Sequence, residues 1–340
     1  MALLWFLLII GVSILVHELG HYWAARAQGV GVKNFALGFG PTLLKFDWRG
    51  TTWRLNAIPL GGYAEIEGMM PGDAHGYSRL STWGKFLILV GGVVMNLLLA
   101  WLLLATLASV RGLPEAVPGQ AQVAAVVEGS RAEAIGLKAG DVIVALNGQP
   151  LKSWEEVRNF REGAGEKRFT VRRGGETVEI RFDWPGGEGT LGIRYGPIIR
   201  YTKLPFFQAF FRSIADTVTA APAAFRAIVT GLVGTVAGQS NTGLSGPVGI
   251  VSVTGQAAQQ GVYTLALLMI QINLSLAIFN LLPIPGLDGG RILILLANVI
   301  ARGRITPEHE ARLSYGGFVF MLLLLVLVTI NDLRNLGGGS

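Results

Sequence analysis

A long apolar segment near the start of the chain contains a metal-binding motif, and this combination most constrains the fold. Residues 3–25 are hydrophobic over a length that can cross a membrane, yet they include the sequence His-Glu-Leu-Gly-His at 17–21. His17 and His21 are one helical turn apart, so both imidazoles can reach one Zn²⁺ ion, while Glu18 can accept a proton from water. Because ionisable groups are costly in lipid, we favour this functional interpretation over a chance match, or over histidines bonded to a neighbouring helix.

The composition is that of a membrane protein. Of 340 residues, 51% are hydrophobic and only 15% are charged, whereas soluble domains have about 25% charged residues. The segments long and apolar enough to cross a bilayer are 3–25, 86–110, 262–282 and 315–330. Four crossings place both termini on the same side. The first segment has no basic residue before its apolar run, so we expect it to remain in the mature protein rather than to be removed as a signal peptide.

Basic residues in two loops predict the orientation. Seven lysines and arginines lie between the first two segments, and three arginines lie at 302–312, shortly before the last one. Because positively charged loops stay in the cytoplasm, we expect a membrane protein whose termini and residues 111–261 are extracytoplasmic. The active site then lies in the cytoplasmic half. The net charge of +6 follows from this topology, and no basic stripe with interleaved aromatics predicts a nucleic-acid partner.

A second motif offers the third protein ligand that a catalytic zinc site needs. Residues 280–290 are Asn-Leu-Leu-Pro-Ile-Pro-Gly-Leu-Asp-Gly-Gly, and their prolines and glycines should break the third apolar segment near its end. Broken backbone at membrane depth is tolerated only within protein or beside a watery cavity. Asp288 is either the third ligand or the cap of a helix expected at 291–300. Beside the first motif, we favour the ligand.

The absence of cysteine leaves His, Asp and Glu for any metal chemistry, because it excludes thiolate ligands, a cysteine nucleophile and disulfides. The two other histidines, His75 and His309, lie in polar stretches and are expected at the surface. Residues 337–340, Gly-Gly-Gly-Ser, are typical of an added linker.

With these motifs the chain resembles the site-2 protease family of intramembrane zinc metalloproteases (peptidase M50-like), in particular its bacterial RseP-type branch. Two further runs carry the resemblance: Gly-Gly-Val-Val-Met-Asn at 91–96 and Leu-Ser-Gly-Pro-Val-Gly-Ile at 244–250. The resemblance implies that His17, His21 and Asp288 bind Zn²⁺ and that Glu18 is the catalytic base. It also implies that Asn280 helps to hold the substrate backbone.

The same resemblance implies regulated intramembrane proteolysis in the bacterial cytoplasmic (inner) membrane. The expected substrates are single-pass membrane proteins, such as anti-sigma factors already trimmed by an upstream site-1 protease, or remnant signal peptides. Two alternatives of other classes are a zinc transporter or sensor and a non-catalytic membrane scaffold. No internal repeat of the kind found in transporters is visible, and a structural zinc site would not need a base such as Glu18.

Residues 32–82 are expected to form a membrane-associated β region, with short strands at 32–37, 42–48, 52–57 and 62–67. By resemblance this is a membrane-reentrant β-hairpin whose exposed edge receives an unwound substrate as an added strand; an ordinary cytoplasmic hairpin is the alternative. In the second apolar segment, Gly91, Gly92 and Asn96 are expected to pack against the metal-bearing helix, and a structural role is favoured over substrate contact.

Residues 112–200 predict a compact α/β module outside the membrane. The expected elements are strands at 123–127, 140–148, 168–172 and 177–182, a short helix at 131–136, and a helix opened by a capping box of Ser153 and Glu156. The arrangement resembles a single circularly permuted PDZ domain, with Leu191, Gly192 and Ile193 as its peptide-binding loop. The best-studied family members carry two such domains, so gating that depends on the pair is not carried over.

The predicted fold is therefore an α-helical polytopic membrane protein with about four transmembrane helices, a membrane-associated β-hairpin or sheet and one inserted extracytoplasmic PDZ domain. Residues 201–261 are expected to form an amphipathic helical linker, either on the outer membrane surface or packed against the transmembrane bundle. The expected divisions of the chain are 1–31, 32–82, 83–111, 112–200, 201–261, 262–300, 301–336 and 337–340.

Overall fold

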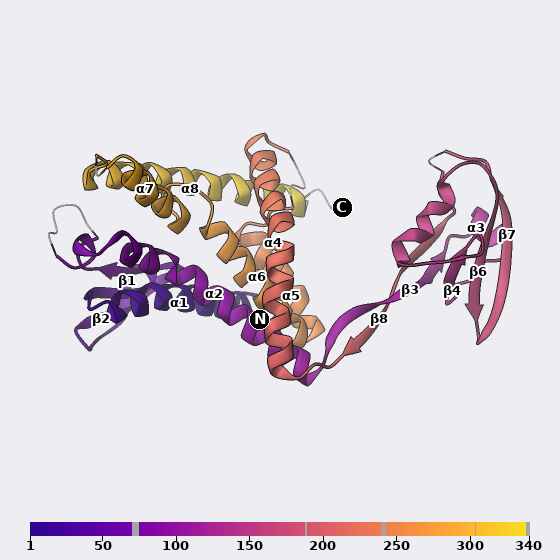
Figure 1. Ribbon diagram of the computed structural model, residues 1–340, viewed down its shortest axis with the longest axis horizontal. Coiled ribbons are helices and arrows are strands. Elements are labelled where there is room, and N and C mark those ends of the chain that lie inside the picture. Colours follow the sequence, from indigo (N-terminus) through magenta and orange to yellow (C-terminus); the bar gives the residue numbers. More distant parts are fainter. Residues whose placement is uncertain (70–74, 188, 240–242, 303, 338–340) are drawn as a thin grey trace. The chain divides into compact units, whose positions relative to one another are not determined.

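The computed structural model describes residues 1–69, 75–187, 189–239, 243–302 and 304–337 (Figure 1). The chain forms two compact units, which we describe separately: one comprises Met1–Leu107 with Pro205–Ser340, and the other comprises Ala108–Leu204. Of the terminal linker expected at 337–340, residues 338–340 lie outside the described residues.

The first unit is mainly helical. Its helices are α1 (Ala2–Ala27), the short 3-10 helix η1 (Gly76–Arg79), α2 (Thr82–Val110), α4 (Phe206–Val236), α5 (Pro247–Gln260), α6 (Val262–Asn280), α7 (Asp288–Ile300) and α8 (Pro307–Gly337). Within the described residues, α1, α2, α4, α6 and residues Ala311–Arg334 of α8 are long and apolar enough to cross a membrane. The chain is thus a multi-pass helical membrane protein with five candidate spans, one more than the four predicted. The additional one is α4.

The sequence assigned α4 to the amphipathic linker at 201–261, because polar residues interrupt its apolar run. The helix satisfies some of these polar groups internally, since the hydroxyls of Ser213 and Thr217 donate to carbonyls four residues earlier. It also packs on α2, where Trp101 Nε1 donates to Thr217 Oγ1 at 3.0 Å. Figure 1 shows α4 crossing the direction of α1 and α2 rather than running alongside them.

Helices α1 and α6 pack side by side in the same direction. Near their N-terminal ends, Ile9 and Leu265 belong to one buried cluster. One to two turns further along, Asn273 Nδ2 donates to Ser13 Oγ at 2.9 Å. The C-terminal end of α6 therefore lies at the level of the His-Glu-Leu-Gly-His motif in α1.

The β region consists of β1 (Val32–Trp48) and β2 (Thr51–Ile66), which form an antiparallel pair. The register places Leu37 opposite both Leu55 and Gly62, so the first half of β1 lies between the two halves of β2. The four short strands predicted from sequence are therefore present, in the spatial order 42–48, 51–56, 32–37 and 62–66. They form two continuous strands rather than four, because glycines such as Gly38 (φ +84°) bend the chain without ending it.

A buried cluster fixes this sheet to α1 and α2. Its members are Tyr22, Ala25, Val30, Val32, Phe35, Ile66, Tyr77 and Ile88. The β region is thereby held against the helix that carries the motif.

The second unit is an antiparallel sheet with helical crossings. Its elements are β3 (Leu113–Val126), α3 (Arg131–Ala134), β4 (Val142–Leu146), β5 (Gln149–Pro150), the 3-10 helix η2 (Trp154–Arg161), β6 (Gly165–Arg173), β7 (Glu176–Trp184) and β8 (Ile193–Thr202). The strand order is β7-β6-β4-β3-β8, with β5 paired to β4. The strands and helices predicted for this part of the chain are all present, and β8 is an edge strand.

One local prediction in this unit is wrong. Ser153 makes no side-chain capping hydrogen bond, so the predicted capping box does not form. Instead, the Glu156 carboxylate accepts a hydrogen bond from the Lys152 backbone N–H at 2.7 Å. The reason is that η2 winds as a 3-10 helix, whose tighter turn carries the Glu156 side chain past the position that a capping box requires.

Candidate metal centre

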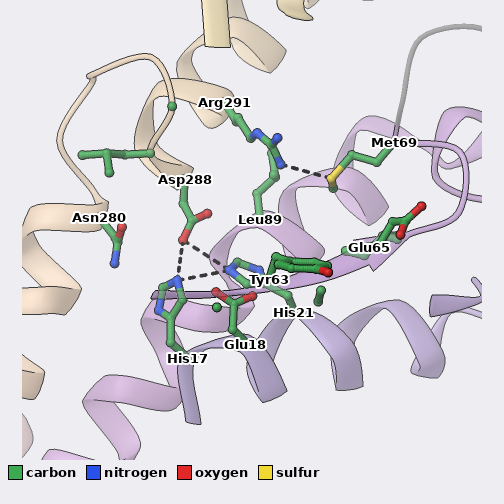
Figure 2. A pocket seen from close by; sticks show the side chains of 15 residues that line it. His17, Glu18, His21, Tyr63, Glu65, Met69, Leu89, Asn280, Asp288 and Arg291 are labelled. Carbon is green, nitrogen blue, oxygen red and sulfur yellow. Dashed lines mark hydrogen bonds and ion pairs between the residues drawn. The ribbon is translucent and has the colours of Figure 1, made fainter. Parts of the chain in front are cut away.

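The three predicted ligands meet at one point. His17 and His21 project from one face of α1, with 3.2 Å between their Nε2 atoms. Asp288, at the start of α7, places its Oδ2 at 3.2 Å from His17 Nε2 and 3.4 Å from His21 Nε2 (Figure 2). Among the described residues these form the one group of three His, Cys, Asp or Glu side chains close enough to hold a metal ion. His75 and His309 are exposed, as predicted.

The break between α6 and α7 places Asp288 at this point. Helix α6 ends at Asn280, and α7 begins at Asp288 with Leu287 as its N-cap residue. No side-chain capping hydrogen bond forms there, so the alternative role of Asp288 as a helix cap is not observed. Gly289 and Gly290 pack directly on backbone atoms of the break, where any side chain would collide. Only glycine allows α7 to start this close to the preceding loop.

The distances between the ligand atoms fit zinc. Zinc binds imidazole nitrogen at about 2.0–2.1 Å and carboxylate oxygen at about 2.0–2.2 Å, so tetrahedral ligands lie about 3.3–3.5 Å apart. The three observed separations are 3.2, 3.2 and 3.4 Å. Moreover, Asp288 Oδ2 is buried and accepts no hydrogen bond from the described residues. A buried carboxylate oxygen without a donor calls for a cation, and a divalent ion would satisfy all three ligands together.

A second contact fixes the orientation of His21. Its Nδ1 lies 2.8 Å from the carbonyl oxygen of Ile88 in α2. Because a carbonyl can only accept, Nδ1 carries the proton and donates it, which leaves the Nε2 lone pair for a metal. The two imidazole rings are nearly perpendicular, at 82°, and converge through their Nε2 atoms.

Glu18 lies between α1 and the β region. Its carboxylate lies beside the backbone N–H of Ala64 in β2. Figure 2 shows Glu18 beside His21 and below Tyr63, on the side of the ligand cluster that faces β2. The glutamate thus lies next to the strand and is not itself part of the ligand triangle.

A cavity of about 420 Å³ opens onto these residues. Its lining residues are His17, Glu18, His21, Gly62, Tyr63, Ala64, Glu65, Ile66, Met69, Leu89, Asn280, Gly286, Leu287, Asp288 and Arg291. Five consecutive residues of β2, at 62–66, take part. Because neighbouring side chains of a strand point to opposite faces, a continuous run of lining residues means that the edge of the strand borders the cavity.

Asn280 is the last residue of α6 and lines the same cavity. In Figure 2 its amide lies beside Asp288 and His17, across the cavity from Tyr63. The side chain makes no hydrogen bond to any other described residue, so its donors and acceptor are available to a molecule in the cavity.

Sequence reasoning missed several lining residues. Arg291 is the most notable, because among the described residues its side chain donates only to the thioether sulfur of Met69, from Nη1 at 3.1 Å. Its position one helical turn after Asp288 was a usable signal, since residues three apart share a helix face. Tyr63 and Glu65 gave no such signal, because nothing in a β-strand pattern indicates what borders its edge.

The predicted peptide-binding loop belongs to the second unit. Leu191 is 2% exposed and lies in the hydrophobic core, while the carbonyls of Leu191 and Gly192 accept hydrogen bonds from Ala132 and Val127. Gly192 adopts a φ of +84°, which favours glycine. Ile193 opens the edge strand β8 and packs only partly on the core.

Comparisons with known proteins agree with the geometry of the first unit. The model of peptidase family M50 matches residues 5–324. A Fusobacterium nucleatum protein provisionally named zinc metalloprotease FN1322 is 33% identical over 96% of this chain and 97% of its own length. The chloroplastic membrane metalloprotease ARASP of Arabidopsis thaliana is 31% identical over 95% of this chain and 76% of its own. The regulator of sigma-W protease RasP of Bacillus subtilis is 27% identical over 97% of this chain and 98% of its own.

Proposed function

The chain belongs to peptidase family M50 and is an intramembrane zinc metalloprotease of the site-2 protease type, and from this premise we propose that His17, His21 and Asp288 bind the catalytic zinc and that Glu18 is the catalytic base. The observation that carries the proposal is the triangle of three ligand atoms with the spacing of a tetrahedral face. Family membership favours this peptidase over the transporter and scaffold alternatives. Bound zinc supplies a Lewis acid that lowers the pKa of water and polarises a carbonyl group.

Glu18 performs the proton transfers. Its carboxylate takes a proton from the attacking water and returns it to the nitrogen of the leaving amine. The carboxylate lies beside the backbone N–H of Ala64, on the side of the ligand cluster that faces β2. Because Ala64 belongs to the strand edge at the cavity, the catalytic base lies next to the edge along which we place the substrate.

We place the substrate along the edge of β2 at residues 62–66. A helical transmembrane segment hides its peptide bonds, so it must unwind before hydrolysis, and a strand edge can pair with the unwound chain. The opposite edge of this part of β2 pairs with β1, while the edge at the cavity borders Glu18. Asn280 faces the substrate from the other side of the cavity and bonds its backbone. The position of this edge beside the metal centre favours a role in substrate binding over the alternative of an ordinary cytoplasmic hairpin.

We propose that four helices cross the membrane and that α4 lies at its outer surface. The parallel packing of α1 and α6 supports this, because the two helices must start on the same side and an even number of crossings must separate their starts. The direction of α4 across α1 and α2 fits a surface helix. The basic loops then lie in the cytoplasm, and the termini and residues 108–204 lie outside.

We propose that residues 112–200 form a PDZ domain that admits or rejects substrates. The edge strand β8 lies beside η2, where the Trp154 and Tyr195 rings meet at 6.1 Å, and an extended peptide can add to this edge. Because Leu191 is a core residue, peptide binding is better tested at Ile193, which is only partly buried.

The proposed substrates are single-pass membrane proteins such as anti-sigma factors, first trimmed by a site-1 protease, or remnant signal peptides. Support comes from the Bacillus subtilis relative, which is named as a regulator of sigma-W protease. Cleavage within the membrane would release a cytoplasmic fragment.

Replacing the proposed base tests the assignment directly. Glu18→Gln should lower cleavage of a membrane-embedded substrate by about 10²–10⁴-fold, because the amide cannot accept the proton from water. Zinc content should be unchanged, since Glu18 is not a ligand. Glu67→Gln is the matched control, because Glu67 is an exposed glutamate just past the end of β2 and should leave cleavage intact. Full activity in Glu18→Gln would remove Glu18 from the role of base.

A further inference from the structure

Asn96 of α2 is fully buried next to the metal centre, with 0% of its surface exposed. Its Nδ2 lies 3.4 Å from Nδ1 of His17, the ring nitrogen that faces away from the ligand triangle. Its Oδ1 is also buried and accepts no hydrogen bond from the described residues. A buried amide oxygen without a donor is costly, so this side chain needs a partner that helix packing alone does not supply.

Helix α2 forms a wall of the metal centre around Asn96. At Gly92, one turn earlier, a Cβ atom would lie only 2.6 Å from His21 Nε2 and 2.7 Å from His17 Nε2, so no larger residue fits. The backbones of Gly20 and Gly91 are also in contact. The sequence favoured a packing role for Gly91, Gly92 and Asn96, three residues of the Gly-Gly-Val-Val-Met-Asn run. The glycines have that role, but the contact between Asn96 and His17 goes beyond packing.

The chemistry of His17 determines what Asn96 must offer. As a ligand, His17 must present an unprotonated Nε2, so its proton resides on Nδ1 and requires an acceptor. With the amide NH₂ group toward His17, two donors would face each other. Rotating the amide by 180° exchanges its oxygen and nitrogen within the same shape. Oδ1 then accepts from Nδ1–H, and the buried oxygen gains the donor that it otherwise lacks.

The other histidine already shows this arrangement. His21 donates its Nδ1–H to the Ile88 carbonyl, which also belongs to α2. Ile88 and Asn96 are two turns apart on α2, and they face His21 and His17 in the order that antiparallel helices require. One helix thus provides an acceptor behind each imidazole, one from its backbone and one from a side chain.

We propose that Asn96 is a positioning residue of the zinc site, whose Oδ1 accepts the Nδ1–H of His17 and so directs His17 Nε2 to the metal. The inference rests on the proposed role of His17 as a ligand. Asn96 acts through His17 and contacts neither the substrate nor the metal. Such partners behind a ligand typically change metal affinity by about 10–100-fold.

The test is zinc affinity, measured on the purified full-length protein by competition with a coloured chelator. Asn96→Leu keeps the size of the side chain but removes the acceptor, and we expect it to weaken zinc binding about 10–100-fold. Asn96→Asp keeps an acceptor oxygen at the same position and should restore affinity to within a few fold of the wild type. A merely structural role would not predict this rescue, because a buried carboxylate packs no better than leucine.

Asn273 supplies the matched control. It is equally buried, in α6, and donates to Ser13 Oγ and to the Met269 carbonyl rather than to a ligand. Asn273→Leu should lower thermal stability but leave zinc affinity unchanged. If Asn96→Leu does not fold, Asn96→Ala is compared with Asn96→Asp in the same way.

Two results would overturn the inference. One is a folded Asn96→Leu or Asn96→Ala variant that binds zinc like the wild type. The other is an Asn96→Asp variant that binds zinc no better than these two. His17→Ala separates this failure from failure of the proposed function: if His17→Ala keeps wild-type zinc affinity, His17 is not a ligand. If only His17→Ala loses zinc while Asn96 variants do not, the ligand assignment stands and the role of Asn96 is wrong.

Discussion

Two aspartates in the membrane unit, Asp288 and Asp332, are both removed from solvent but have opposite surroundings. Asp332, near the end of α8, is 5% exposed and accepts hydrogen bonds from Gly246 N–H at 3.1 Å and Gly249 N–H at 2.8 Å. Asp288 has a 14% exposed side chain, and its buried Oδ2 has no hydrogen-bond donor among the described residues, only two imidazole nitrogens nearby. The same side chain therefore has a structural role in one place and a metal-binding role in the other.

The difference lies in the donors that the fold supplies. Asp332 faces the N-terminus of α5, where backbone N–H groups have no partner within the helix and the helix dipole favours a negative charge. Side chains at residues 246 and 249 would crowd this carboxylate, so both positions are glycine. Asp288 also begins a helix, yet it turns away from that helix's own N–H groups toward α1. A buried carboxylate is saturated in the first case and left for a cation in the second.

The strongest test of this difference is Asp288→Asn. Losing the negative charge should weaken zinc binding by more than the roughly 100-fold expected for loss of a supporting partner, and cleavage should fall to background. The fold should persist, because the buried Oδ2 of Asp288 accepts no hydrogen bond from the described residues. Zinc content and proteolysis of a membrane substrate measure the effect. A variant that keeps its zinc would place Asp288 in the same structural class as Asp332.

Asp332→Ala should have the opposite effect: it should lower stability and leave zinc binding unchanged. Each N–H group left without a partner costs about 1–3 kcal/mol, so thermal stability should fall clearly while each folded chain keeps its zinc. The measurement pairs a thermal unfolding curve with zinc analysis of the folded fraction. Zinc loss from a folded Asp332→Ala protein would contradict the proposed separation of the two roles.

The sequence allowed Asp288 to be predicted but not Asp332, for a physical reason. The pattern around Asp288 is local: two prolines and three glycines break a helix, and the spacing of His17 and His21 identifies the partner. Asp332 meets its partners across 83 and 86 residues, and no periodicity links the end of one helix to the start of another. Nothing in the sequence Gly-Pro-Val-Gly at 246–249 indicates which acidic side chain approaches it.

The same limit applies elsewhere in the fold. The strand segments of the β region and the elements of the second unit followed from alternation and turns, which are local properties. The capping box at Ser153 failed because its residues were present but the turn geometry differed. That α4 is long and apolar enough to be a candidate span was not predicted, because the partners that its polar residues find within the helix and on α2 are not visible in the sequence pattern.

A third carboxylate, that of Asp141 in the second unit, has surroundings that make the stability of this unit depend on pH. Burial would raise its pKa, but hydrogen bonds from Arg173 and from the Lys138 backbone N–H outweigh burial and hold the pKa below 3.8. Stabilisation is therefore full above that pH and is lost as pH falls through the lowered pKa of the folded state.

Asp141→Asn should destabilise the second unit by about 1–2 kcal/mol at neutral pH, because charge-assisted hydrogen bonds to Arg173 are lost. Hydrogen exchange of residues 108–204 in the full chain, measured from neutral pH down to about pH 3, would show the wild type approaching the variant in acid. A difference that stays constant across this range would mean that the charge of Asp141 does not contribute.

The smallest effect is expected at Glu179 in β7, which is the most exposed of the four carboxylates. Its side chain is 46% exposed, and it lies 3.5 Å from Arg168 and 3.4 Å from Arg181, which are themselves 40% and 63% exposed. Water solvates these charges in the folded and unfolded states alike, so Glu179→Gln should change stability by no more than about 0.5 kcal/mol and should leave zinc content and cleavage unchanged. The same exchange experiment used for Asp141 measures it, in low salt and in high salt. If Glu179→Gln costs as much as Asp141→Asn, then burial is not what makes a carboxylate consequential in this protein, and the contrast between Asp288 and Asp332 needs another cause than their donors.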